Sequence, residues 1–152
     1  MKNLLKTLGI LLVTGGVVAL VATSVSGQDA SFRRLMGENM NHLQKIMVSM
    51  VNSQYEGVPA DVRVIAQHAQ DLTQRIPSHV RGPEARNRFL AYANNLGSVS
   101  NNLVVVVEEL LRHDQTQQNP GQMNIDYLRV AAASHLGEMI TTCVACHNQF
   151  RR

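Results

Sequence analysis

Four long segments of this sequence repeat apolar side chains at steps of three and four residues. They run from about residue 29 to 53, from Pro59 to Ile76, from Pro83 to His113 and from Gln122 to Phe150. That spacing places the apolar side chains on one face of an α-helix. The breaks contain Pro, Gly and polar residues, which end helices and form turns. Because short connections favour antiparallel neighbours, the sequence predicts an all-α fold, an antiparallel four-helix bundle.

The apolar stripes indicate which side chains fill the core of such a bundle. In chain order they are Phe32, Met36, Met40, Leu43, Met47 and Met50 or Val51; Val62, Ile65, Ala69, Leu72 and Ile76; Phe89, Ala93, Leu96, Ser100, Leu103, Val107 and Leu110; and Ile125, Leu128, Ala132, His135, Met139, Cys143, Cys146 and Phe150. The run Val104 to Val107 lies inside a longer helical period, so we expect helix there rather than a strand. The polar segment Asp114 to Gly121 is expected to be a surface loop.

The first 27 residues differ from the rest of the chain. Lys2 and Lys6 precede an apolar stretch from Leu8 to Val21, and small or polar residues follow. This order is typical of a secretory signal peptide. We therefore expect a signal peptide over residues 1–27 and one domain over residues 28–152, exported to the periplasm. An uncleaved membrane anchor is the alternative, although the apolar run is shorter than the roughly 20 residues of a spanning helix. No stable membrane insertion is expected after cleavage.

The charge of the chain does not favour nucleic acid as a partner. The sequence holds 14 Lys and Arg against 11 Asp and Glu, and loss of Lys2 and Lys6 leaves the mature part near neutrality. It has no basic cluster of the kind that binds nucleic acid. A nearly neutral surface also gives little electrostatic steering toward a partner.

The only two cysteines stand in the sequence Cys143-Val-Ala-Cys146-His147, near the end of the last helical segment. On a helix, positions i, i+3 and i+4 project from one face. The pattern is typical of c-type haem attachment, in which two thiols bond the vinyl groups and the imidazole binds iron. We therefore expect one haem c, linked to Cys143 and Cys146, with His147 as an iron ligand.

Other uses of two closely spaced cysteines fit less well. A thioredoxin-like pair needs a helix start that lowers a thiol pKa, and these cysteines lie near a helix end. A zinc site needs further ligands at suitable spacing, and the sequence has no other cysteine. A disulfide across two residues of a regular helix has poor geometry.

The segment from Cys143 to Arg151 resembles the ending of the class II c-type cytochromes, the cytochrome c-prime family with its low-spin relatives. The segments that begin at Phe32 and at Tyr55 are similar more loosely, so the resemblance covers nearly the whole mature chain. It implies a four-helix bundle with the haem attached to the C-terminal helix. It also implies that the first helix provides the residue on the other face of the haem.

In the low-spin relatives this residue is a methionine that binds iron, and Met36 is the expected ligand here. An alignment on the segment Gly37 to Met40 makes Met40 the runner-up. In cytochromes c-prime the sixth coordination position of the iron is instead empty and lies behind an apolar residue. Core packing is the plainer role for any one of these methionines, because methionine commonly fills gaps in cores. The family also has a basic residue beside the proximal imidazole, a role that Arg151 would take.

The remaining histidines are not expected to bind the iron. His135 lies three turns before His147 on the same helix, too far to reach the same metal. The others are expected to be solvent-exposed: His42, His68, His79 and His113.

The predicted function depends on whether the sixth coordination position of the iron holds Met36 or is empty. Iron held by His147 and Met36 suits an electron carrier between periplasmic or membrane redox partners, with no enzymatic activity. An empty sixth position suits binding of NO or CO. Haem-based catalysis is disfavoured because the first helix offers few polar groups near the expected site. A homodimer through the first two helices, as many relatives form, is compatible with either function.

Overall fold

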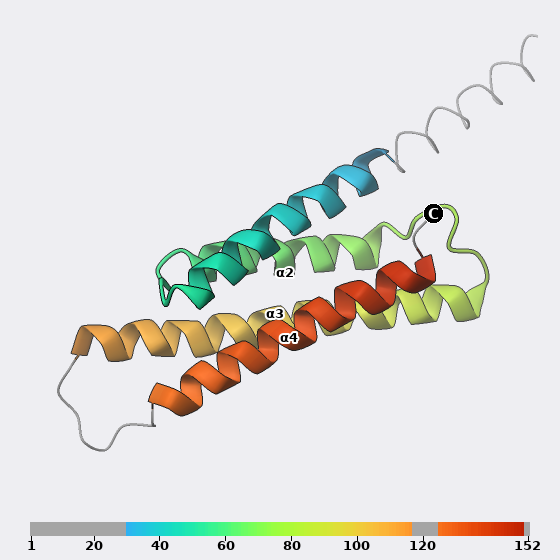
Figure 1. Cartoon of the computed structure of the whole chain (residues 1–152). Coiled ribbons are helices and arrows are strands. Elements are labelled where there is room, and N and C mark those ends of the chain that lie inside the picture. Colours follow the sequence, from blue (N-terminus) through green and yellow to red (C-terminus); the bar gives the residue numbers. More distant parts are fainter. Residues whose placement is uncertain (1–29, 117–124, 151–152) are drawn as a thin grey trace, which may run out of the picture.

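The computed structural model describes residues 30–116 and 125–150, which form four helices in antiparallel succession (Figure 1). They are an N-terminal helix over residues 30–51, α2 (Val58–Gln74), α3 (Pro83–Thr116) and α4 (Ile125–Phe150). These two ranges contain no strand, and the predicted all-α four-helix bundle is confirmed. None of the helices in the same ranges has the length and hydrophobicity of a membrane-spanning segment. The predicted signal peptide over residues 1–27 lies outside them.

Local sequence sets the ends of the first two helices. The N-terminal helix ends in a left-handed turn at Ser53, whose φ is +56°. There the amide of Ser53 donates to the carbonyl of Met50, and that of Gln54 donates to the carbonyl of Ser49, so two otherwise unpaired carbonyls are satisfied. α2 begins with Pro59 in its first turn, where a missing N–H costs nothing.

Two predicted boundaries are wrong. α2 ends at Gln74 rather than at Ile76, since Pro77 keeps the residue before it out of the helical conformation. α3 continues to Thr116, so the predicted loop does not begin at Asp114. A polar sequence is as compatible with a last helical turn as with a loop, and composition alone does not distinguish these two structures.

The core is centred on α3, where every residue of the predicted stripe is buried: Phe89, Ala93, Leu96, Ser100, Leu103, Val107 and Leu110. The stripe of α2 is also confirmed, except that Ile76 lies beyond the helix and is only partly buried. In α4 three of the predicted residues are buried: Leu128, Ala132 and Met139. Ile125, at the start of α4, is exposed, so its predicted place in the core is wrong.

The stripe predicted for the N-terminal helix is partly wrong. Leu43 is buried as predicted, whereas Met40 and Met47 are 47% and 42% exposed. Of the alternatives Met50 and Val51, Met50 packs against the core and Val51 is 85% exposed. Ile46, outside the predicted stripe, is fully buried. Ile46 and Met47 follow Leu43 by three and four residues, and both steps suit a helical stripe. Packing against the other helices decides between them, and Ile46 is the one that lies in the main core.

Candidate functional site

A cavity of about 800 Å³ lies between the N-terminal helix, the start of α3 and the last turns of α4. Cys143, Cys146 and His147 line it together, as expected for one face of a helix. Met36 and Met40 line the same cavity from the N-terminal helix. The fold therefore brings the predicted thiols, the predicted imidazole and both candidate methionines to one cavity, although the methionines are on the first described helix and the other groups are on the last.

The chain's three phenylalanines all line this cavity. Phe89 contacts the other two, with ring centroids 6.4 Å from Phe32 and 5.5 Å from Phe150. Tyr92 adds a fourth ring, 6.3 Å from Phe150 in an edge-to-face arrangement. These rings form an apolar wall, so four of the chain's six aromatic side chains line the cavity.

The polar residues that line the cavity have a positive bias. Arg33 reaches it from the N-terminal helix, and Ser78, His79 and Arg81 reach it from the connection between α2 and α3. Among the described residues that line this cavity there is no Asp or Glu. The arrangement suits an apolar ligand that carries negative groups.

His79 was expected to be exposed, and that prediction is wrong. Its Nε2 lies 2.8 Å from the main-chain oxygen of Phe150, in the last turn of α4, and the contact is partly buried. The sequence pattern gave no sign of it, because the connection between α2 and α3 meets α4 only in the folded chain.

The two thiols are free and partly buried. Burial raises the pKa of Cys143. Burial, followed by the charge of Cys143, raises the pKa of Cys146 to about 11. A redox-active pair requires the opposite, a lowered thiol pKa at a helix N-terminus. These cysteines are therefore poorly suited to thiol–disulfide exchange.

The two candidate methionines differ in their surroundings. Met36 is partly buried and packs with the cluster that contains Leu72 and Phe89. Met40 is 47% exposed. Met36 is therefore the better placed of the two to present its sulfur inside the cavity.

The remaining predicted exposures are also wrong, because interhelical pairing is invisible in a helical pattern. His42 and His68 are partly buried between the N-terminal helix and α2, and the side chain of His113 is only 9% exposed. His135 is partly buried, and its Nδ1 has no hydrogen-bond partner among the described residues. Neither His42, His68, His113 nor His135 lines the cavity.

Arg151 lies outside the described residues. Comparison of the chain with protein-family models, with curated proteins and with solved structures found no match.

Proposed function

We propose that this chain is an exported monohaem c-type cytochrome that carries electrons between periplasmic or membrane redox partners. The observation that supports this most directly is the cavity of about 800 Å³ that Cys143, Cys146, His147 and Met36 line together. The resemblance of the last helix to the class II c-type cytochromes supports the same function.

The residues around the cavity fit a haem. Its volume lies within the roughly 300–1,000 Å³ of cofactor pockets, which combine apolar walls with a few polar groups. Two thiols and an imidazole on one helix face match the attachment pattern. The aromatic wall suits the flat macrocycle, and the cations of Arg33 and Arg81 suit its two carboxylates.

Each of these side chains would have a separate role. Cys143 and Cys146 would tether the macrocycle to α4, and His147 and Met36 would hold the iron. When bound, the haem supplies a one-electron redox centre. Phe32, the rest of the aromatic wall and the bundle around it would exclude water from that centre. With His147 and Met36 both holding the iron, little would rearrange on electron transfer, and the sulfur ligand would raise the reduction potential.

The oxidised and reduced absorption spectra of the full chain, expressed with c-type haem attachment, test this proposal. We expect a six-coordinate low-spin spectrum with a sulfur-to-iron charge-transfer band in the oxidised form. Met36→Ala should become high-spin and bind CO, whereas the matched variant Met40→Ala should keep the wild-type spectrum. A wild-type protein that is high-spin and shifts with CO would instead support the binding of NO or CO.

Export is the second part of the proposal and has its own test. The periplasmic fraction of an expressing cell should contain a chain that begins at Gln28, as its intact mass would show. A haem-bearing chain that retains residues 1–27 in the membrane fraction would support the uncleaved anchor instead.

A further inference from the structure

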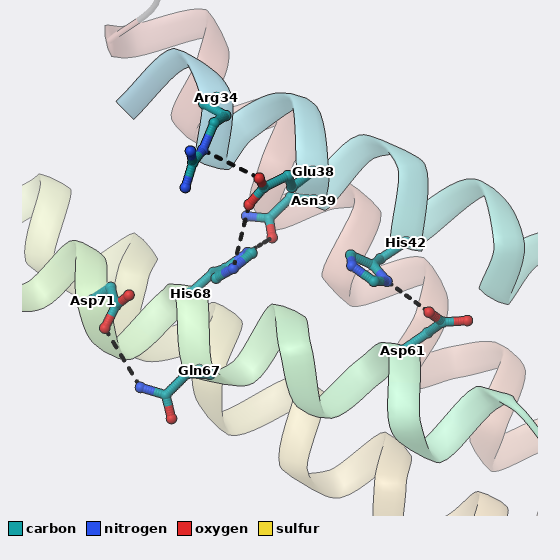
Figure 2. A network of polar contacts seen from close by, with 8 residues as sticks. All are labelled: Arg34, Glu38, Asn39, His42, Asp61, Gln67, His68 and Asp71. Carbon is teal, nitrogen blue, oxygen red and sulfur yellow. Dashed lines mark hydrogen bonds and ion pairs between the residues drawn. The ribbon is translucent and has the colours of Figure 1, made fainter. Parts of the chain in front are cut away.

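A network of polar contacts joins the N-terminal helix to α2 (Figure 2). His68 of α2 lies between two residues of the N-terminal helix, with Nδ1 2.6 Å from Asn39 Oδ1 and Nε2 3.8 Å from Glu38 Oε2. One helical turn farther along, His42 Nδ1 lies 2.6 Å from Asp61 Oδ1 of α2. The two helices are thus joined by paired side chains next to the segment that carries Met36.

That segment has no buried side chain to anchor it. The buried side chains of the N-terminal helix are Leu43 and Ile46, both in its second half. From residue 30 to residue 42 every side chain is at least partly exposed. Phe32, Leu35 and Met36 make partly buried contacts, which slide and rotate more easily than a directional hydrogen bond. The rotation of this half of the helix therefore depends strongly on its polar contacts with α2.

The position of Asn39 connects this rotation to Met36. At about 100° per residue, a side chain three positions later lies about 60° away around the helix axis, one turn farther along. When Asn39 is held toward α2, Met36 is directed to the neighbouring side, where the cavity lies. A rotation that releases Asn39 would also turn Met36 and Met40 relative to the cavity.

We propose that His68 is a positioning residue for Met36: its contact with Asn39 fixes the rotation of the N-terminal helix that presents the Met36 sulfur to the haem iron. This inference rests on the proposed function in one respect, the ligation of iron by Met36. The imidazole Nδ1–H donates to the Asn39 carbonyl oxygen, and Nε2 faces the Glu38 carboxylate.

The contact between His68 and Asn39 differs from a pair of exposed surface side chains because His68 is largely buried. Its side chain is only 16% exposed, so water competes weakly for its nitrogen atoms. Arg34, on the N-terminal helix, pairs with Glu38 at 3.3 Å and holds that carboxylate beside the imidazole. Within the described ranges, α3 and α4 contribute no ion-pair partner to His68.

The test compares His68→Ala, His68→Gln and the control His113→Gln in the full-length holoprotein. The glutamine of His68→Gln would keep an N–H donor for Asn39. His113 is a suitable control because it is a similarly buried histidine whose partner, Glu109, lies on its own helix, α3. Two readouts are taken: the fraction of low-spin haem, and the amide hydrogen exchange of residues 36–42.

In His68→Ala we expect the low-spin fraction to fall and the exchange of residues 36–42 to accelerate about five- to tenfold, as loss of one hydrogen bond predicts. His68→Gln should restore most of both properties, and His113→Gln should change neither. Unchanged exchange in His68→Ala, or exchange that rises equally in His113→Gln, would overturn the inference.

The two readouts also separate this inference from the proposed function. If the wild-type haem is high-spin, Met36 is not the ligand and the proposed carrier function fails. Faster exchange confined to residues 36–42 in His68→Ala would then still support the role of His68 in orienting the helix, and unchanged exchange would overturn that too.

Discussion

The imidazole Nε2 of His79 lies 2.8 Å from the main-chain oxygen of Phe150 and so joins the connection between α2 and α3 to the last turn of α4. The last four carbonyls of a helix have no partner within the helix, and a side-chain donor satisfies one of them here. Both residues also line the cavity that contains Cys146 and His147. The contact therefore holds the connection between α2 and α3 against the end of α4 that carries the proposed haem attachment.

Replacement of His79 should loosen this end of α4. We expect His79→Ala to lower the free energy of unfolding of the holoprotein by about 1 kcal/mol, the usual net value of one hydrogen bond. Urea denaturation followed by circular dichroism measures it, and hydrogen exchange should rise in the last turn of α4. A loss of stability without faster exchange in that turn would show that His79 acts elsewhere.

The buried thiols predict an unusual pH dependence in the haem-free chain. Because the pKa of Cys146 is raised from 9.0 to about 11, its thiolate should be roughly a hundredfold rarer at pH 8 than in an unfolded chain. Alkylation by iodoacetamide, quantified for Cys146 by mass spectrometry, should therefore be slower by a similar factor than in 8 M urea, since the thiolate is the nucleophile. Equal rates in the folded and denatured chains would contradict the burial of the thiol.

The same shift has a consequence for stability. A raised pKa of an acid means that its charged form is disfavoured in the folded state. The contribution of the protonated Cys146 thiol to the free energy of unfolding is thus fully present below pH 9.0 and is lost as the pH rises toward about 11. Cys146→Ser should remove much of this loss, because serine does not ionise in that range.

The N-terminal helix offers a matched pair of core substitutions. Ile46→Ala should destabilise the protein by about 2–5 kcal/mol, because it removes a fully buried side chain and leaves a cavity. Met47→Ala should change the free energy of unfolding by less than about 0.5 kcal/mol, since Met47 is 42% exposed. Urea unfolding of both variants measures the difference. Similar losses of stability in both variants would mean that Met47 belongs to the core, as the sequence pattern predicts.

The sequence predicts the helices of this protein better than their mutual contacts. The stripe of α3 is confirmed from Phe89 to Leu110 because that helix is central and its buried face follows directly from periodicity. The N-terminal helix packs at the edge, where Ile46 and Met47 suit the pattern equally well. The shared cavity of Cys143, Cys146 and His147 follows from their spacing, whereas the approach of His79 depends on how a connection folds back.

The charge around the cavity gives a last prediction, which concerns the reduction potential of the bound haem. A positive side chain favours the reduced iron, because reduction removes one positive charge. A unit charge about 10 Å away in a water-like dielectric contributes about 0.4 kcal/mol, or about 20 mV. Arg81→Gln should therefore lower the potential by on the order of 20 mV, and the difference should shrink at high salt. Arg88→Gln is the matched control, because Arg88 pairs with Glu84 on α3 and does not line the cavity. A redox titration of both variants measures the effect, and equal shifts would mean that Arg81 acts only through the net charge of the protein.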